Sequence, residues 1–404
     1  MDGTRVFVVA LLLCLAPIAG VVASDTGNEL PQTDEEPDQS MTVVTVENSS
    51  EYLAPQSGAI DRAESRAPKI DVAGAIEADA GQLRSIYLRE TLERRYRNAD
   101  TDAERRAVVE RGTERLSDRV DGIEAKERTA IRQFNEGTIG SDELFRALAT
   151  VHREAEATDT ALEWLETTAD DLDVDEAEKQ AAAAQVRLVP MEGPIRKRLS
   201  DAIEGGSTSR IHVETVGDGI VLAMVSSPGE TYLREAHDPT AKQVDVSDQY
   251  DGNPSPALDR FTELYPWAIQ SFDAIDAIGP AQVRLYRFSA AHPHGELKTY
   301  LDSGSTDILY EKQRIDPESV PTTTIERTDG DLRLRFNTTR AGGPLGISAV
   351  DTTTEERVDA AIELNGEAVG TTDESRLWTV APRGQTTVNA TYAGETRTFD
   401  VRFD

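Results

Sequence analysis

Residues 141–172 read SDELFRALATVHREAEATDTALEWLETTADDL, and this segment sets the architecture of the N-terminal half of the chain. Apolar or small side chains recur in it at alternating intervals of four and three, which is the spacing of one face of an α-helix. Ser141 stands where a helix cap is expected, and acidic residues fill the first turn after it. The members of the seam are Leu144, Leu148, Val151, Ala155, Thr158, Leu162, Leu165, Ala169 and Leu172.

The segments on both sides of this helix carry the same periodicity, so residues 59–205 are predicted to form an antiparallel helical bundle or coiled coil. A preceding helix starts near Thr101, and its seam is interrupted by one charged residue, Glu127. Short loops between long helices imply antiparallel neighbours. We expect the apolar seams to be satisfied inside the bundle; the alternative is a coiled coil that binds a partner. The first helix carries Ile76, Ala80, Leu83 and Tyr87, and the later helices carry Ala177, Ala181, Ala184 and Leu188 and then run to Ile203.

Residues 208–316 change to a period of two and are predicted to form an α+β domain with an antiparallel sheet. Alternating residues from Ile211 to Thr215 and from Ile220 to Met224 flank Gly217-Asp218-Gly219, which indicates a hairpin. Ser255-Pro256 is expected to open a helix as its cap and first residue. The apolar face of that helix would comprise Phe261, Tyr265, Ala268, Phe272 and Ile275, and Pro266 would kink the helix or split it.

A Pro- and Thr-rich linker over residues 317–324 leads into residues 322–404, where short strands predict an immunoglobulin-like β-sandwich. Asn365-Gly366 is the strongest hairpin-turn signal in the chain. The fold class is therefore multidomain, with a helical bundle, a central α+β domain and a C-terminal sandwich.

The N-terminal residues are typical of an export signal over residues 1–23. Arg5 precedes an apolar run that begins at Val6, and small residues lead to a cleavage point between Ala23 and Ser24. The apolar run also reaches the lower length limit of a membrane span, so an uncleaved anchor is the alternative. Residues 24–58 are acidic and Pro-containing and are predicted to form a disordered tether, within which residues 42–46 could form a short strand that pairs with a segment further along the chain.

Charge and cysteine content exclude several classes of function. The chain has 74 acidic and 42 basic residues and a formal net charge of −32, which opposes binding to nucleic acid or to anionic lipid. A single cysteine, Cys14, excludes a disulfide scaffold and a Cys-based metal cluster. The acids are dispersed rather than gathered in a tail, which is typical of a surface adapted to high salt.

Part of the sandwich segment resembles the carboxypeptidase-regulatory-like and transthyretin-like domains. The residues that carry this resemblance are Gly343-Pro344-Leu345-Gly346-Ile347 with Val350-Asp351, Val358-Asp359-Ala360, Ile362-Glu363-Leu364-Asn365-Gly366, Val369-Gly370-Thr371-Thr372-Asp373 and Leu377-Trp378-Thr379-Val380-Ala381-Pro382. The resemblance implies a spacer or adhesion module and no catalytic residues.

The whole arrangement resembles a group of exported proteins of halophilic archaea. It does so through Tyr52-Leu53, through residues 98–106 (NADTDAERR), and through His294-Gly295-Glu296-Leu297 with Tyr300-Leu301-Asp302. This resemblance implies a saline environment and a place at the cell surface.

Few residues are candidates for a functional site. His292, His294 and Glu296 could share one strand face and hold a metal ion, but Pro293 disturbs strand geometry, and a turn that leads into a hairpin is the competing interpretation. Glycosylation sequons begin at Asn48, Asn337 and Asn389, and the last two are expected to point away from a strand's buried face. No phosphate-binding glycine loop or nucleophile elbow is found, so we predict no catalytic residue and no cofactor.

The sequence therefore predicts an exported or cell-surface protein that is not an enzyme, whose partner is an envelope protein or a polysaccharide. One alternative is an extracytoplasmic hydrolase with its site in the central domain near residues 292–296. Another is a sensor or assembly factor tethered to the membrane by residues 6–23.

Overall fold

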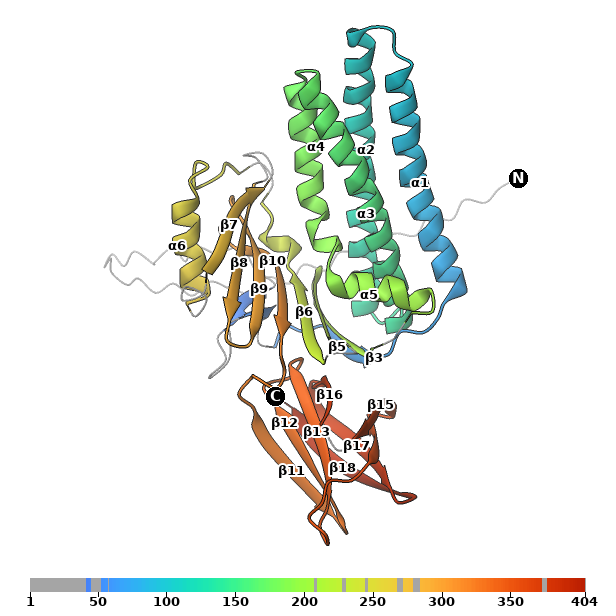
Figure 1. The fold of residues 1–404 in the computed structure, drawn as a ribbon, viewed down its shortest axis with the longest axis vertical. Coiled ribbons are helices and arrows are strands. Elements are labelled where there is room, and N and C mark those ends of the chain that lie inside the picture. The colour runs from blue at the N-terminus through green and yellow to red at the C-terminus, as the bar shows by residue number, and fades with distance from the viewer. Residues whose placement is uncertain are drawn as a thin grey trace, which may run out of the picture. The chain divides into compact units, whose positions relative to one another are not determined.

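The computed structural model describes residues 41–44, 52–56, 58–206, 209–226, 230–243, 246–266, 272–278, 284–372 and 376–403. Signal residues 1–23, with Ala23 and Ser24, lie outside them, as does Asn48. The expected architecture is confirmed: a helical domain, a central sheet with helices, and a C-terminal sandwich (Figure 1).

Five helices build the N-terminal domain, and the four long ones run alongside one another in Figure 1. They are α1 (Val72–Arg97), α2 (Asp102–Asn135), α3 (Ser141–Asp171), α4 (Asp175–Leu188) and α5 (Pro194–Ile203), with a 3-10 turn η1 (Val189–Met191) before α5. The seam of α3 is buried from Leu144 to Ala169, and that of α2 is buried throughout, Glu127 included. Thr101 caps α2 in a capping box with Glu104. The cap of α3 is Gly140 rather than Ser141, which is the first helical residue and is buried.

Helix α1 packs on α3 with a face of small residues, and the face that carries its large apolar residues is exposed. Ile76, Leu83 and Tyr87 are exposed, whereas Gly74, Ala78, Gly81 and Ser85 are buried. Gly74 and Gly81 leave no room for a Cβ beside Arg146 and Glu154 of α3. The expectation that every seam is satisfied inside the bundle is therefore wrong for α1, because small residues let the two backbones approach.

The central sheet has eight antiparallel strands in the order β3-β4-β5-β6-β10-β9-β8-β7. They are β3 (Arg62–Arg66), β4 (Ile211–Val216), β5 (Gly219–Ser226), β6 (Thr231–His237), β7 (Phe272–Ile278), β8 (Leu285–His292), β9 (Gly295–Asp302) and β10 (Ile308–Ile315). A 3-10 turn, η2 (Pro239–Ala241), follows β6. Apolar residues of α2, α3 and α5 share one core with β4 and β5, including Phe134, Leu148, Ile195, Val213 and Leu222.

A second core joins the sheet to α6 (Pro254–Leu264), where Phe261 stacks on Phe288 at 4.4 Å. The cap of α6 is Asn253, which accepts a hydrogen bond from the Ser255 N–H, so the helix begins two residues before the expected Ser255-Pro256 start. It ends before Pro266, so this proline causes no kink. Phe272 and Ile275, expected on the helix face, lie in strand β7 instead.

Two short strands of the expected tether are folded onto the sheet. They are β1 (Met41–Val44) and β2 (Tyr52–Pro55), which pair with each other. The N–H groups of Met41 and Leu53 donate to the buried carboxylates of Asp238 (3.0 Å) and Glu311 (2.7 Å). Residues 41–44 and 52–55 are therefore not a disordered tether, because side chains of the sheet satisfy their backbone groups.

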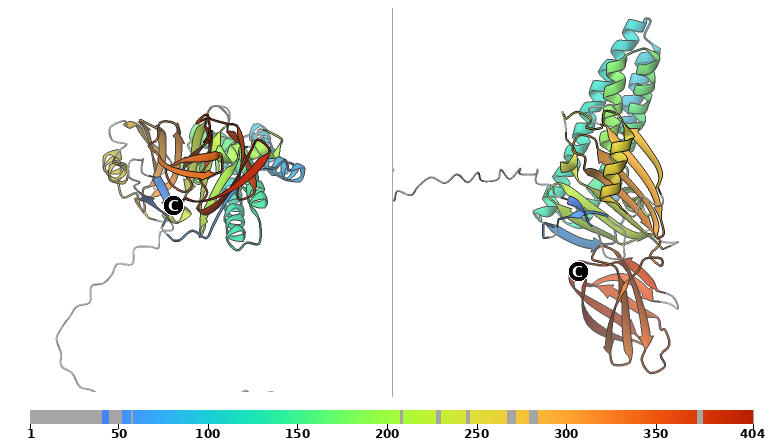
Figure 2. Two further views of the ribbon diagram at one scale, coloured as in Figure 1. Left: turned by 90° about the horizontal axis from the view of Figure 1, so that it is seen from below. Right: turned by 90° about the vertical axis from the view of Figure 1, so that its left-hand side faces the viewer.

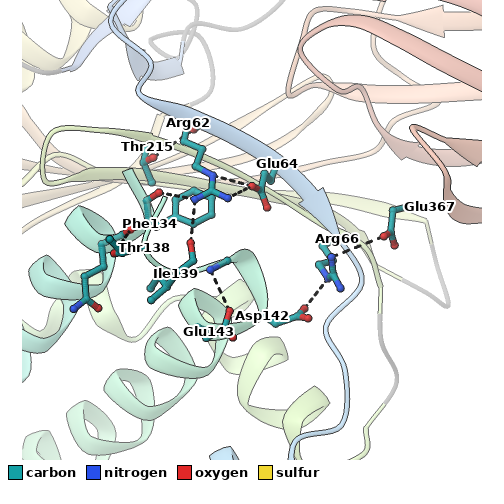
Figure 3. Close-up of polar contacts among 12 residues, drawn as sticks. Arg62, Glu64, Arg66, Phe134, Thr138, Ile139, Asp142, Glu143, Thr215 and Glu367 are labelled. Carbon is teal, nitrogen blue, oxygen red and sulfur yellow. Dashed lines mark hydrogen bonds and ion pairs between the residues drawn. The ribbon is translucent and has the colours of Figure 1, made fainter. Parts of the chain in front are cut away.

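Strand β3 lies at the sheet edge and contacts both neighbouring parts of the fold (Figure 3). Arg62 donates to the carbonyls of Phe134 (2.7 Å) and Ile139 (3.0 Å), at the turn between α2 and α3. Arg66 pairs with Asp142 at 2.7 Å and with Glu367 of the sandwich at 3.9 Å. Side chains of β3, a strand of the central sheet, therefore contact both the helical bundle and the sandwich.

The C-terminal sandwich consists of two four-stranded sheets that face each other (Figure 2). One contains β11 (Thr323–Asp329), β12 (Leu332–Thr338), β13 (Pro344–Asp351) and β16 (Leu377–Val380); the other contains β14 (Ala360–Leu364), β15 (Glu367–Thr372), β17 (Gly384–Tyr392) and β18 (Glu395–Phe403). Strand β11 begins inside the expected linker. Asn365 and Gly366 both adopt positive φ, as the predicted hairpin turn requires.

Candidate functional site

A cavity of about 560 Å³ lies between the helical domain and the central sheet. Helices α2 and α4 and the turn η1 form one side, and β6, η2 and β10 form the other. Its apolar wall includes Ala183, Val186, Met191 and Leu309. This volume lies in the range of sites that hold a small molecule or a few side chains of a partner.

Charged residues at the cavity form ion pairs with one another. Arg187 of α4 contacts Asp121 at 2.5 Å and Glu124 at 2.6 Å, both from α2. Burial opposes the charge of Arg187, but the hydrogen bonds that it donates to the two carboxylates, and their negative charges, outweigh this effect and raise the pKa of the guanidinium. Lys242 pairs with Asp302 at 2.8 Å. The charges around the opening are thus largely balanced, which leaves the apolar wall and the polar floor to select a ligand.

His237 contributes a buried imidazole to the lining of the cavity. Its side chain is 8% exposed and lines the cavity, and its Nδ1 has no hydrogen-bond partner among the described residues. The ring meets that of Tyr310 edge-on at 6.3 Å. Burial lowers the pKa of His237, so the imidazole is neutral near pH 7 and offers one donor and one acceptor.

A buried ionic cluster lies next to His237 and joins the bundle to the sheet. Arg196 of α5 is 1% exposed; its Nη2 lies 2.5 Å from Glu127 Oε1 of α2, and its Nε lies 3.8 Å from Glu235 Oε2 of β6. Burial opposes the charge of Arg196, but Glu127 and Glu235 raise its pKa. Burial raises the pKa of Glu235, while Arg196 partly offsets this. The cation between two carboxylates fixes the cavity walls against each other.

The local sequence explains how Arg196 reaches this position. Gly193-Pro194 ends the preceding turn and starts α5, so Arg196 lies in the first turn of that helix. A Cβ at Gly193 would collide with Glu235 and with the Tyr310 hydroxyl. The backbone N–H of Ile195 donates to Glu235 Oε1. Only a glycine therefore allows α5 to approach the sheet closely enough for the ionic cluster to form.

The comparisons with known families agree with this division of the chain. A model described as a domain of unknown function (DUF7096) matches residues 1–208, just over half of the chain. The chain belongs to this family. A second family of unknown function (DUF7094) matches residues 211–321, so the cavity of this DUF7096 member lies between two matched regions.

The third match concerns the sandwich. An archaeal fibronectin-III type-like domain matches residues 322–399. The sandwich fold is confirmed. The family that matches is of the fibronectin-III type, whereas the sequence motifs resembled transthyretin-like domains. Such domains are typical of surface proteins. No curated protein and no solved structure shows significant similarity to the chain.

The predicted metal-binding residues lie at the hairpin between β8 and β9, toward the edge of the sheet opposite β3. Strand β8 ends at His292, Pro293 and His294 form the turn, and Glu296 is exposed on β9. The side chain of His292 lies outside the described residues. No group of three His, Cys, Asp or Glu residues in the described part is placed to hold a metal ion. The triad therefore stays a sequence-based prediction.

Two sequon asparagines lie in strands of the sandwich. Asn337 of β12 and Asn389 of β17 are half-buried, between neighbours whose side chains enter the core. They point away from the core, as expected. The amide of Asn337 donates to Thr324 Oγ1 at 3.2 Å, and Asn389 accepts from Thr398 Oγ1 at 2.9 Å. Glycosylation at Asn48, Asn337 or Asn389 stays a prediction.

A second polar chain joins the sheet to the sandwich. Ser65 Oγ lies 2.8 Å from His212 Nδ1, and His212 Nε2 lies 3.1 Å from Glu214 Oε1, which also receives Arg383 Nε at 2.8 Å. The pKa of Glu214 lies well below its usual range. Burial raises this pKa, but hydrogen bonds and charge interactions with His212 and Arg383 lower it by a larger amount, so the carboxylate is ionised. Because Arg383 already neutralises this carboxylate and Ser65 contacts Nδ1, we assign the chain to the domain joint rather than to catalysis.

The sequence missed Arg196, Glu235, His237 and Tyr310 as site residues. Glu127 was identified from the sequence only as a defect, a charged residue in the apolar seam of α2. The usable signal was that defect, because a carboxylate in an apolar seam requires a buried cation nearby.

Within the described residues, no helix combines the length and the hydropathy that crossing a membrane requires.

Proposed function

We propose that this DUF7096 member is an exported, non-enzymatic binding protein of the archaeal cell surface. Its ligand site is the cavity between α2, α4 and the central strands β6 and β10 of the sheet. The fibronectin-III-like sandwich supports a surface location, and it would serve as an accessory module. The dispersed acidic surface and the export-type N-terminus support work outside the cell in high salt.

The observation that carries the proposal is the cavity of about 560 Å³, which is lined in part by His237, a residue whose buried Nδ1 has no hydrogen-bond partner among the described residues. A buried polar atom without a partner is unfavourable by about 1–3 kcal/mol, so a ligand group that bonds to it gains affinity there. The ionic cluster of Arg196 holds the walls in place before binding. Preorganised walls reduce the entropy lost on association.

The lining favours a protein partner over a polysaccharide. The described walls present alanine, valine, proline, methionine and leucine side chains beside charged and amide groups, and apart from the His237 imidazole they contain no aromatic ring on which a sugar could stack. Apolar side chains of a partner segment fill such a space well. A hydroxyl, amide or backbone N–H of the same segment would then bond to His237. The envelope protein is thus the preferred partner of the two that the sequence suggested.

Site-specific photo-crosslinking tests this assignment. A photoreactive phenylalanine analogue replaces Gln180, an exposed residue that lines the cavity, or, as a control, Thr353 on the exposed sandwich surface. Envelope proteins of a halophilic host are added in molar salt. We expect one product at position 180 that is absent at position 353 and is lost when His237→Phe is added. The same product at both positions, or one indifferent to His237, would contradict the proposed site.

The export part of the proposal has a separate test. N-terminal sequencing of the protein from culture medium and envelope fractions should find Ser24 as the first residue. A mature protein that retains residues 6–23 in the membrane would instead support the tethered alternative.

A further inference from the structure

Helix α1 presents an apolar face that nothing in the described structure covers. Every large hydrophobic side chain noted as exposed in the described part of the chain lies between Ile70 and Tyr87. Val72, Ile76, Leu83 and Tyr87 are 68%, 64%, 62% and 69% exposed. Their spacing places them on one stripe of the helix. Exposed apolar stripes of this kind mark interaction sites.

The bundle itself cannot take up this stripe. The opposite face of α1 already packs on α3 through Gly74, Ala78, Gly81 and Ser85, and Ser85 hydrogen-bonds Thr158 at 3.1 Å. Close packing at Gly81, beside Glu154, fixes the rotation of α1 about its axis. The occupant of the apolar stripe must therefore come from outside the bundle.

The order of the residues along the stripe is self-complementary. Ile76 and Leu83 are equidistant from the point between Asp79 and Ala80, and so are Val72 and Tyr87. A second α1 running in the opposite direction would place Ile76 against Leu83 and Val72 against Tyr87, twice over. We propose that α1 is the contact between two copies of this chain, packed antiparallel about a two-fold axis at that point. Such an interface is isologous, the commonest kind in homodimers.

The charges beside the stripe fit the same arrangement. Glu77 and Arg84 are exposed and lie on the same flank of α1, so the two-fold axis brings Glu77 of one copy near Arg84 of the other. Asp79, which lies within the stripe, pairs with Arg153 of α3 at 2.5 Å, an arginine that it shares with Glu204, so its charge is partly offset. The net charge of −32 opposes association of two copies in dilute buffer, so the contact forms at high ionic strength.

Sedimentation velocity of the full chain tests the contact. At about 2 M NaCl, where the Debye length falls to ~2–3 Å, we expect a reversible dimer whose Kd lies in the micromolar range, because one helix pair is a small interface. Ile76→Glu with Leu83→Glu should raise Kd at least about 100-fold. The matched control is Ala125→Glu with Thr129→Glu, which adds the same charge to the exposed face of α2 and should leave Kd unchanged.

The stripe residues are exposed, so the variants should keep the melting temperature of the parent protein, which is measured alongside. A protein that stays monomeric up to about 200 μM, or a dimer that the stripe variant leaves intact, would overturn the proposal.

Cysteine cross-linking tests the antiparallel register. In a Cys14→Ser background, Ile76→Cys with Leu83→Cys should give a disulfide-linked dimer, whereas each single variant should not. Identical residues of an antiparallel pair would be offset by seven residues, about 10 Å along the axis, beyond the ~7 Å that a disulfide spans. Cross-linking of the single variants as efficiently as the double variant would contradict the two-fold antiparallel contact.

Discussion

Arg196 shows how one buried cation organises the candidate site. It lies between Glu127 of the bundle and Glu235 of the sheet, and its Nη1 has no hydrogen-bond partner among the described residues. An incompletely satisfied buried ion pair adds little net stability, but it becomes strongly unfavourable when one partner is removed. The main effect of the cluster is therefore to position the cavity walls and His237, and its contribution to the free energy of folding is small.

Removing the cation alone should destabilise the protein more than removing the whole cluster. Arg196→Met leaves two buried carboxylates without a counter-charge, and we expect a loss of about 3–5 kcal/mol in the free energy of unfolding. Adding Glu127→Gln and Glu235→Gln to it should restore most of that loss. Urea unfolding at fixed salt measures both. A triple variant as unstable as Arg196→Met would show that the charges are not the cause.

Glu192, in the turn before α5, makes stability depend on pH. Burial, reinforced by Asp159 and Glu156, raises the pKa of Glu192 from 4.5 to about 8. Because the folded protein binds this proton more tightly than the unfolded chain, stability falls as pH rises from about 4.5 to 8. Glu192→Gln should therefore stabilise the protein at pH 8 and above by on the order of 3 kcal/mol, and should leave stability near pH 4.5 almost unchanged.

Melting temperatures between pH 5 and 9 measure this difference, with Glu110→Gln on the exposed face of α2 as the control. Equal melting temperatures for Glu192→Gln and the parent protein at pH 9 would contradict the raised pKa.

At the scale of elements, the helices show what periodicity can and cannot reveal. Their seams were predictable because α2 and α3 bury large residues on one face, from Val109 to Phe134 and from Leu144 to Ala169. The buried face of α1 was not, because Gly74, Ala78, Gly81 and Ser85 also recur at helical spacing but carry almost no hydrophobic signal.

Two glycines in neighbouring helices should respond to alanine in opposite directions. A Cβ at Gly81 of α1 would collide with Glu154, which Lys126 pins at 2.6 Å and Arg119 at 3.2 Å. Gly81→Ala should therefore destabilise the protein by about 1–2 kcal/mol. A Cβ at Gly122 of α2 meets nothing within 4 Å, so Gly122→Ala should stabilise it by about 0.5–1 kcal/mol. Both values come from urea unfolding, and a stabilising Gly81→Ala would refute the close α1–α3 contact.

The candidate site was harder to predict from the sequence than the fold was. Glu127 stood out as a charge in a seam, but its partners Arg196 and Glu235 come from another helix and from the sheet. His237 gains its role only where β6 meets η1 and α4. A short strand near Met41–Val44 was predictable from the sequence, whereas its partner Tyr52–Pro55 was not. The carboxylates of Asp238 and Glu311, which satisfy the backbone of the two strands, lie far along the chain and were not predictable either.

At the scale of the whole molecule, charge decides the conditions under which the protein is stable. A net charge of −32 produces self-repulsion that salt screens. We expect the melting temperature to rise by roughly 10 °C or more between about 0.1 and 2 M salt. NaCl and KCl should act alike, since screening depends on ionic strength. A melting temperature that stays constant or falls with salt would contradict adaptation to brine.

The central claim is that the cavity between α2, α4 and the sheet binds the partner. The direct measurement is calorimetric titration of the partner segment identified by cross-linking, in molar salt, into the parent protein and into Ala183→Trp, which fills the cavity from its half-buried wall. We predict that Ala183→Trp weakens binding at least about 30-fold, and that Ala125→Trp on the exposed face of α2 leaves it unchanged. Equal affinity for the parent protein and Ala183→Trp would contradict the account.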